Sequence, residues 1–589
     1  MGLNKSEIRS FGRSIGVSLA ALILASCGSE SVISDAGGDR QITIYTAKNI
    51  VTVNPEMPEA KAVAINKEGR IIGLGTTAEL KNKFSKAAID ARFKDKIITP
   101  GLIDPHIHMT LGAMMYGLDF VPPWDMETPK GTVSGLPNKA ALLAKIAKFE
   151  AAAPDGPLFL YGYHNLVQGD LTRQDLDKIS EKRPIFIWHY SGHDFYLNSA
   201  AIDWAKLTPA LADKYHGIGL DENGALNGRI YEDATLALFG TIGPVLLAPD
   251  HIKKGFEGYE KIFARSGVTT VAEMGYGIFG RALEDHYINT YYTDEDNYNL
   301  YLVPEHRAFT QEFGAQALAK MQEMSADKTR NPPVLNQVKL FTDAAFYSQT
   351  MKMSDPGYIG GQSKGTTGLW VTQPNDLADV MRPYWAAGMD IHIHSNGDAA
   401  QDATLGAFAE MEGGGRQQRL IIEHGGLFRP DQIERAAQLG IGISAASHYV
   451  KYMGADYEDA IGEKTAFITP LASALKAGMR ATIHSDAPLA PPQPLKAASV
   501  HMTRETRQGG VSNPNEKLTH HQALKAITLD AAWSLGLDKE IGSIEIGKRA
   551  DFAILDANPM VTAPKDWSDI EVWGVMLGGD IRPVNYDVK

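Results

Sequence analysis

Cysteine is nearly absent from this sequence: Cys27 is the only one among 589 residues, so no disulfide can form within the chain. Basic residues are outnumbered as well, with 57 Lys and Arg against 70 Asp and Glu and a formal net charge of -13. This balance excludes nucleic acid as the main partner, because phosphate binding needs a basic surface. The composition, 44% hydrophobic and 22% charged, is typical of a globular protein. The length of 589 residues is sufficient for one large and one smaller domain.

An apolar run near the N-terminus, SIGVSLAALILASC, is too short to span a bilayer but has the length of a signal-peptide core. Three basic residues precede it, so residues 1–27 are predicted to be an export signal. Its end, LASC, resembles the lipobox of bacterial lipoproteins, which predicts that Cys27 is lipidated and becomes the mature N-terminus. Residues 28–40 are polar and glycine-rich and predict a flexible tether. We therefore expect a periplasm-facing protein that meets the membrane only through its lipid anchor, with the outer membrane preferred.

Short alternating runs occur at both ends of the chain. ITIYTAKNIVTV, AVAINKEGRIIGLG and KDKIITP lie near the start, and IGSIEIGKRADFAILDANP and VWGVMLGGDIRPV lie near the end. Alternation between turn residues predicts β-strands. We expect residues 41–98 and 541–589 to form one small β-sandwich domain, with a larger domain over residues 99–540 inserted between its two parts.

Eight short apolar runs alternate with longer helical stretches in the larger domain. This alternation predicts an α/β fold of the (β/α)8 TIM-like barrel type, whose active site lies at the carboxyl ends of the strands. The gap at about 110–267 is too long for one connection and predicts an insertion with its own strands, in PLFLYGYHN and PIFIWHYSGHDFYLNS. The eight runs are GLIDPHIH, GVTTVAEM, NLYLVPEH, QVKLFTD, MDIHIHS, RLIIEH, GIGISAA and MRATIHSD.

Residues of metal-ligand type fall at the ends of these predicted strands. His106 and His108 in PGLIDPHIHM are two apart, so on an extended segment both side chains aim at one point. Taken alone, this short motif fits two ordinary histidines equally well. Even without Lys339, four of the eight strands carry such groups, which favours a metal site at the barrel mouth. The other candidates are Lys339, His392, His394, His424 and Asp486.

Five motifs occur in a fixed order: PGLIDPHIH, VKLFTDAAF, HSNGDAAQDA, IIEHG and HSDAP. The segment GYHNLVQGDLTRQDLDKISEKRPIFIWHYSGHDFYLNSAAI lies between the first two motifs. These motifs and this segment resemble those of the amidohydrolase superfamily. The resemblance covers residues 41 to about 560. The resemblance is closest to the YtcJ-like branch that includes N-substituted formamide deformylases.

The resemblance implies one or two divalent metal ions, expected to be zinc. His106 and His108 would bind the first ion and His394 and His424 the second. Lys339 would be carbamylated, that is carboxylated on Nζ, and would bridge the two ions, while Asp486 would complete the first site. Asp486 would also take the proton from metal-bound water, and the resulting hydroxide would attack the substrate carbonyl.

Several of these roles have alternatives. An unmodified Lys339 would leave a mononuclear site. His193, in the insertion motif SGHDFYLNS, is a candidate catalytic residue that would stabilise the carbonyl oxygen, or an ordinary polar residue of the insertion. Five more residues are expected to support ligands, to contact substrate or to serve the fold alone: Glu273, Asp343, His392, Asp398 and His484.

The sequence therefore predicts a metal-dependent amidohydrolase that cleaves an amide, N-acyl or N-formyl C–N bond of a small, partly apolar substrate. A mononuclear deaminase or cyclic-amide hydrolase is the alternative enzyme, although HIHSNGDAAQD lacks the glutamate that deaminases of this superfamily usually carry. A metal-binding or ligand-binding lipoprotein without catalysis is the alternative outside enzymes. A small molecule is the expected partner, and a homodimer is left open.

Overall fold

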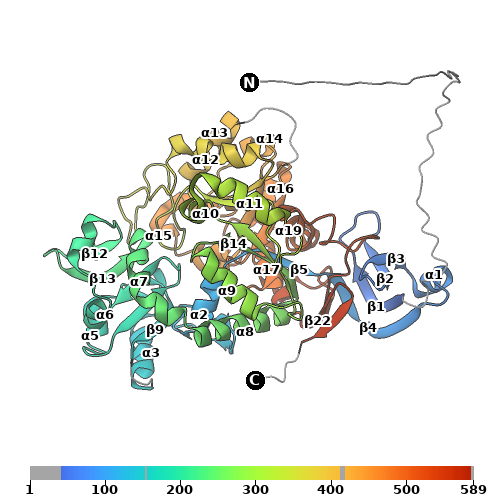
Figure 1. Cartoon of the computed structure of the whole chain (residues 1–589), viewed down its shortest axis with the longest axis horizontal. Helices are drawn as coiled ribbons and strands as arrows, with labels where there is room; N and C mark the ends of the chain where they lie inside the picture. The colour runs from blue at the N-terminus through green and yellow to red at the C-terminus, as the bar shows by residue number, and fades with distance from the viewer. Residues whose placement is uncertain (1–41, 153–155, 412–417, 585–589) are drawn as a thin grey trace, which may run out of the picture.

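Eight parallel strands form the central part of the protein, and most of them are followed by helices (Figure 1). The computed structural model describes residues 42–152, 156–411 and 418–584, so the predicted signal peptide, Cys27 and the tether lie outside the described residues. Each of the eight runs predicted as strands contains one. Their bounds are β5 (Leu102–Ile107), β14 (Val268–Tyr276), β15 (Asn299–Pro304), β16 (Gln337–Phe341), β17 (Asp390–Ser395), β18 (Leu420–His424), β19 (Gly442–Ala446) and β20 (Ala481–His484).

These strands lie in two arcs. One arc has the order β15-β14-β5 and the other runs from β16 to β20, and all neighbours within an arc are parallel. Isolated bridges join the arcs at both seams, Glu305 with Lys339 and Ile107 with Ala487. The order along the chain is therefore also the order in space, as the (β/α)8 prediction requires. We call these strands and their helices the βα body.

Helix α8 (Pro249–Ser266) shows how a helix docks on this body. Its buried residues recur at the spacing of one helical face, and it packs against α2 (Met109–Tyr116), where a side chain on Gly255 would clash with the backbone of Ala113. The other main helices of the body are α9 (Arg281–Tyr291), α10 (His306–Phe313), α11 (Ala317–Ala326), α12 (Pro374–Ala386), α13 (Asp398–Met411), α14 (Pro430–Gln438), α16 (Leu471–Lys476), α17 (Pro494–Thr503), α18 (His520–Ala526) and α19 (Leu529–Ser534).

Strands from both ends of the chain share one mixed sheet, with the order β23-β22-β21-β4-β1-β2-β3. Antiparallel pairing of β4 with β21 joins the two ends, with Ile98 opposite Ile554. The prediction named a sandwich of two layers, whereas hydrogen bonds join all seven strands into a single sheet. The strands are β1 (Thr43–Val51), β2 (Glu59–Ile65), β3 (Ile71–Gly75), β4 (Ala88–Pro100), β21 (Phe552–Leu555), β22 (Val572–Leu577) and β23 (Asp580–Pro583), with α1 (Thr77–Lys83) beside them.

The segment between β5 and β14 has a six-stranded sheet of its own, in the order β12-β13-β11-β10-β9-β6, at the left of the βα body in Figure 1. The second predicted strand of the insertion is a hairpin, because the chain turns back between Trp188 and its partner Phe195. The strands are β6 (Asp119–Phe120), β9 (Leu158–Tyr163), β10 (Ile185–His189), β11 (Asp194–Leu197), β12 (Ile218–Leu220) and β13 (Leu226–Tyr231). The longer helices are α3 (Lys139–Ala152) and α7 (Thr235–Leu246).

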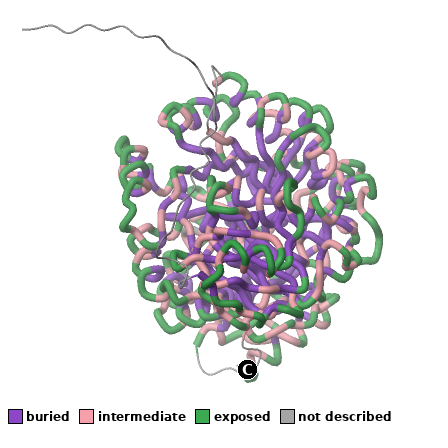
Figure 2. Tube along the Cα trace, turned by 90° about the vertical axis from the view of Figure 1, so that its right-hand side faces the viewer, coloured by how far each residue is buried: buried purple, intermediate pink, exposed green. Residues whose placement is uncertain are grey.

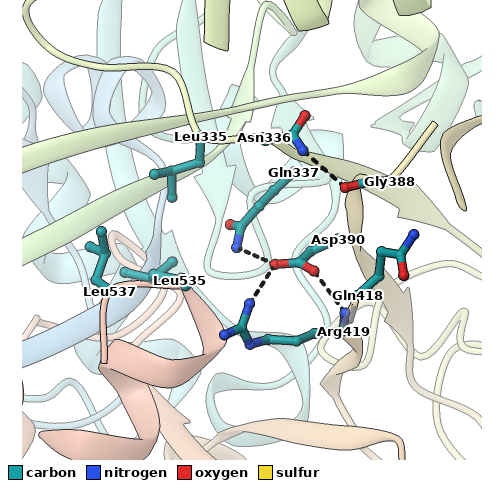
Figure 3. Close-up of a pocket in the computed structure, with 10 residues that line it drawn as sticks. Leu335, Asn336, Gln337, Gly388, Asp390, Gln418, Arg419, Leu535 and Leu537 are labelled. Atoms are coloured by element: carbon teal, nitrogen blue, oxygen red, sulfur yellow. Dashed lines mark hydrogen bonds and ion pairs between the residues drawn. The ribbon is translucent and has the colours of Figure 1, made fainter. Parts of the chain in front are cut away.

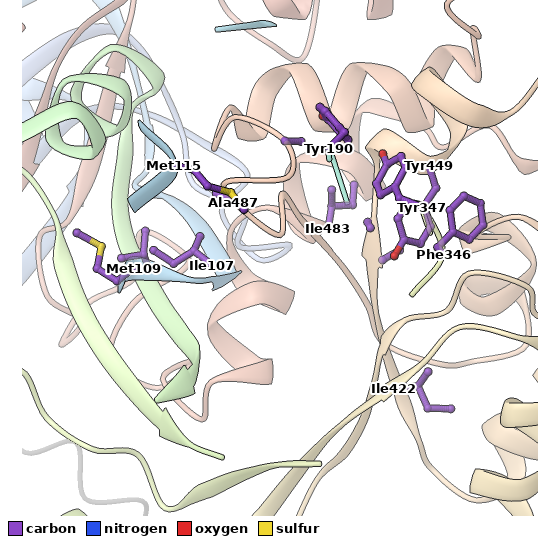
Figure 4. Packing of buried hydrophobic residues seen from close by; sticks show 14 of the residues in the cluster. Ile107, Met109, Met115, Tyr190, Phe346, Tyr347, Ile422, Tyr449, Ile483 and Ala487 are labelled. Carbon is purple, nitrogen blue, oxygen red and sulfur yellow. The ribbon is translucent and has the colours of Figure 1, made fainter. Parts of the chain in front are cut away.

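Buried residues fill the interior and exposed ones lie at the surface (Figure 2). One buried apolar cluster contains residues of both the βα body and the insertion. All residues of β5, β14, β17, β18, β19 and β20 are buried, as expected for parallel strands covered on both faces. Tyr190 from the insertion packs edge-on against Tyr347 of the body, with ring centroids 5.2 Å apart (Figure 4). Among the described residues, no helix is both long enough and apolar enough to cross a membrane.

A buried carboxylate of the insertion, Asp194, forms an ion pair within the insertion and a hydrogen bond to the βα body. Asp194 is fully buried and accepts hydrogen bonds from Arg229 Nε at 2.9 Å and from Ser348 Oγ at 2.9 Å. Asp194→Ala would leave the guanidinium unpaired, so we expect the free energy of unfolding to fall by about 3–5 kcal/mol, measured by urea unfolding. Glu257→Ala, which removes the exposed pair with Lys253, should cost about 1 kcal/mol or less. Equal losses in the two variants would contradict this role of Asp194.

Candidate metal centre

His106 and His108 lie at the carboxyl end of β5 and converge on one carboxylate. Their Nε2 atoms are 3.5 and 3.3 Å from Asp486 Oδ1, and the three side chains are close enough to share one metal ion. The backbone at His108 is held from the insertion side, because Tyr259 of α8 donates its hydroxyl to the His108 carbonyl at 2.9 Å. The structure thus brings together the three residues of the predicted first site.

A second group of potential ligands shares His106. His424, at the end of β18, and His484, at the end of β20, lie with His106 within the spacing of a metal site, and His484 Nε2 is 3.2 Å from His424 Nδ1. His424 and Asp486 have positive φ values of 72° and 57°. Such backbone is sparsely populated by residues other than glycine and is enriched at functional sites, where it redirects a side chain.

Lys339 is buried in β16 and points toward the same place. Its Nζ lies 3.5 Å from His106 Nε2, and burial lowers the pKa of Lys339 to about 8. A lysine with this pKa has a substantial neutral fraction near pH 8, and the neutral amine is the form that reacts with carbon dioxide. The position and the pKa both fit the predicted carbamylation.

His394 is placed differently from the prediction of a second ligand pair. Its ring lies near that of His424, with centroids 4.5 Å apart, but its Nε2 is 3.1 Å from the Ala344 carbonyl and 3.0 Å from Asn396 Nδ2. Within the described part of the chain, the clusters with metal-ligand spacing include His484 rather than His394. The role of His394 as a ligand remains a prediction.

Glu423 is a site residue that the sequence interpretation missed. It is buried beside His424 and accepts hydrogen bonds from His106 Nδ1 at 2.7 Å and from His392 Nδ1 at 2.6 Å. Carboxylates commonly fix the ring of a metal-binding histidine in this way, because the bonded Nδ1–H leaves Nε2 free for the metal. His392 thus contacts the carboxylate that orients His106, which agrees with the alternative that His392 supports a ligand. The sequence signal for Glu423 was a glutamate directly after the apolar residues LII of β18.

The remaining acidic candidates lie around the cluster. Glu273 in β14 accepts from His108 Nδ1 at 3.2 Å and from the Gly275 amide at 2.9 Å, so it orients His108. Asp343 accepts three backbone amides and lies 3.8 Å from His394 Nε2. Asp398 begins α13 and accepts from the Ser354 amide, so its contacts are structural.

Two carboxylates also shape the charge of the cluster. Burial alone would lower the pKa of His108, but the hydrogen bonds that it donates to Asp486 and Glu273 outweigh this effect and raise that pKa to about 9. Burial would raise the pKa of Asp486, yet the neighbouring His424 and His108 hold it well below its ordinary value. The position between His108 and the Asp486 carboxylate therefore stabilises positive charge, which favours a bound cation as well as a proton.

His193 reaches this end of the βα body from the insertion. It lies in the β10–β11 turn, directly before β11, and its Nδ1 is 3.0 Å from Glu232 Oε2. Its imidazole interacts electrostatically with Asp486 and with His394. The insertion therefore contributes a side chain to the surroundings of the cluster without adding to the ligand groups.

A cavity of about 590 Å³ lies away from the cluster, at the amino-terminal ends of β16 and β17 (Figure 3). There Asp390 accepts from Arg419 Nη1 at 3.0 Å and from Gln337 Nε2 at 3.3 Å. In barrels of parallel strands this end serves stability rather than chemistry. The histidines and carboxylates gather at the carboxyl ends, which makes that end the candidate functional site.

A family model and two relatives match most of the chain. A model described as "Amidohydrolase family" matches residues 87–583, and the protein belongs to that family. It is 25% identical over 564 residues to "N-substituted formamide deformylase" of Arthrobacter pascens, an alignment covering 92% of this chain and 98% of the relative. It is 24% identical over 553 residues to "Putative amidohydrolase YtcJ" of Bacillus subtilis, covering 90% of this chain and 97% of the relative.

The fold also has solved counterparts. The structure is similar to an uncharacterized metal-dependent hydrolase from Pyrococcus horikoshii, with a TM-score of 0.65 at 21% sequence identity. The similarity covers 89% of this chain and 99% of that one. A structure of a second such hydrolase, from Pyrococcus furiosus, gives a TM-score of 0.64 at 22% identity. The βα body with its flanking sheet and insertion is therefore an amidohydrolase-type fold.

Proposed function

We propose that this protein is a metal-dependent amidohydrolase that cleaves an amide, N-acyl or N-formyl C–N bond of a small, partly apolar molecule. The observation that carries the proposal is the convergence of His106, His108 and Asp486 at the carboxyl end of the βα body. The relative named N-substituted formamide deformylase supports a formylated or acylated amine as substrate. We further take the two arcs of strands as halves of one (β/α)8 barrel, since bridges join them at both seams.

The residues present fit a divalent metal such as zinc. Two imidazoles and a carboxylate are ligands that zinc prefers, and carboxylates bound to Nδ1 of both histidines keep each Nε2 directed at the cluster. His106, His108 and Asp486 would hold one ion. His424, with His394 or His484 and a carbamylated Lys339, would hold a second. When bound, such a cation lowers the pKa of a water molecule and polarises a carbonyl group.

The protein side chains would orient the substrate and move protons. Asp486, with its Oδ1 3.3 Å from His108 Nε2 and its Oδ2 3.7 Å from His424 Nδ1, is placed to accept the proton of the attacking water. It would then return this proton to the leaving nitrogen, which departs as a neutral amine. In this proposal His193 would donate a hydrogen bond to the carbonyl oxygen as negative charge develops there.

Removal of the metal tests the proposal directly. Protein treated with dipicolinate and desalted should hydrolyse N-formyl and N-acyl amines no faster than the uncatalysed background, measured as amine release. Zinc added with bicarbonate should restore the rate, because the ligands are held in place by the protein. Full activity in metal-free protein, confirmed by elemental analysis, would overturn the metal-dependent mechanism.

The export signal, lipidation of Cys27 and a periplasmic location remain part of the proposal and rest on the sequence alone, as does the question of a homodimer. Mass spectrometry of the N-terminus of protein purified from membranes would test the anchor. A diacylglycerol-modified Cys27 is the expected first residue.

A further inference from the structure

A chain of hydrogen bonds from His193 through Glu232 to Thr350 joins the insertion to the βα body. Glu232 follows β13, and its Oε2 lies 3.0 Å from His193 Nδ1. Its other oxygen, Oε1, accepts a hydrogen bond at 2.7 Å from Thr350, which lies in the loop after β16. Since β16 carries Lys339, Glu232 fixes His193 relative to a strand of the candidate metal centre.

The backbone supports this placement from both sides. The Glu232 amide donates to the His193 carbonyl at 3.0 Å, and Glu232 has a φ of 46°, a conformation that non-glycine residues seldom adopt. Thr350 Oγ accepts the Ala345 amide at 3.1 Å, and its hydroxyl lies closer to Glu232 Oε1, at 2.7 Å, than to its other acceptor, the Ala345 carbonyl, at 3.2 Å. Strain of this kind persists where the surroundings hold a side chain in a required position.

The hydrogen bond with Glu232 determines which protonation state of His193 can donate from Nε2. A carboxylate can only accept, so His193 Nδ1 must carry the hydrogen of the bond with Glu232. In a neutral imidazole the other nitrogen, Nε2, would then be an acceptor, which cannot stabilise a carbonyl oxygen. Only the imidazolium, with hydrogens on both nitrogens, can donate from Nε2 while bound to Glu232.

We propose that Glu232 is a positioning residue that keeps His193 as an imidazolium, with Nε2–H directed at the carbonyl oxygen of the bound substrate. The inference rests on the proposed function, because His193 acts there on the reacting carbonyl. Burial works against the charged form, but the charge and hydrogen bond of Glu232 outweigh it, and the pKa of His193 is raised. The other charged or titratable groups that His193 senses are Asp194, Asp486, His189 and His394.

The test compares Glu232→Gln with Asp233→Asn in the full-length, metal-loaded protein. Asp233 is the neighbouring acid and pairs with the exposed His216, so its variant removes one charge from the same segment and should behave as wild type. In Glu232→Gln we expect kcat for an N-acyl amine to fall about 10²-fold with KM and metal content unchanged, the loss typical of one hydrogen-bond donor to the oxyanion. The alkaline limb of the pH profile should move to lower pH, because the uncharged amide no longer favours the imidazolium.

The ring of His193 gives a readout that does not need turnover. In protein labelled with ¹⁵N-histidine, its signal can be assigned by the loss of one resonance in His193→Gln. It should titrate at lower pH in Glu232→Gln than in wild type and Asp233→Asn. An unchanged titration and an unchanged alkaline limb would overturn the assignment. If the wild type hydrolyses no N-acyl amine, the proposed function fails, whereas this titration still decides whether Glu232 controls His193.

Thr350 supplies a second test should Glu232→Gln fail to fold. Thr350→Val removes the hydroxyl that holds Glu232 Oε1, and Thr350→Ser keeps it. A lower kcat and a shifted limb in the valine variant, rescued by serine, would support the proposal. Equal behaviour of the two variants would contradict it.

Discussion

Replacing Asp486 with asparagine is expected to lower kcat/KM about 10²–10⁴-fold, the range associated with loss of a general acid–base group. The backbone at Asp486 has a φ of 57°, which asparagine tolerates as well as aspartate does. The variant should therefore fold as the wild type but lack the carboxylate that is proposed both to bind the metal ion and to accept the proton. Steady-state amine release and elemental metal analysis on the same preparation measure the two effects.

Asp379→Asn is the matched control, because that carboxylate is exposed on α12 and its ion-pair partner there is Arg382. It should keep wild-type rates and metal content. A fully active Asp486→Asn protein would show that the proton passes through another group. An absence of turnover in the wild type would instead favour the alternative of a ligand-binding protein.

Replacing Glu423 with glutamine is expected to weaken metal binding about 10–100-fold, the usual cost of losing a carboxylate that orients a ligand. A glutamine amide offers one acceptor oxygen and one donor nitrogen, so it cannot accept from both His106 and His392. One of the two rings would lose its partner and its fixed orientation. Competition with a fluorescent zinc chelator measures the change in the dissociation constant.

Glu434→Gln is the control for this variant, since Glu434 is exposed on the helix that follows β18. It should bind metal as tightly as the wild type does. Unchanged metal affinity in Glu423→Gln would mean that His106 is oriented by other contacts, or that it does not bind the metal.

Periodicity predicted the eight strands of the βα body well, because buried parallel strands are short apolar runs between helices. The same rule identified His106 and His108 as a pair facing one side. The insertion hairpin was harder to predict: the turn after His189 is formed by polar residues inside a run that reads as one strand.

Strict alternation along β18 hid the role of Glu423. Neighbours in a strand point to opposite faces, so a ligand at His424 implies that Glu423 points away from the centre. The positive φ of His424 breaks that rule and lets both side chains face inward. Nothing in the local sequence predicts this conformation, because it is imposed by tertiary packing. The same holds for His484, which approaches His424 although β19 lies between their strands, β18 and β20.

Metal content per chain in wild type and in Lys339→Ala tests the central claim most directly. Protein purified without chelators and with bicarbonate should contain two ions, measured by elemental analysis, and Lys339→Ala should contain one or none. Lys339 Nζ lies 3.5 Å from His106 Nε2, so a carbamate there would reach the ligand cluster. A single ion that is unaffected by the substitution would remove Lys339 from the site, and the absence of metal from the wild type would contradict the metal-dependent hydrolase altogether.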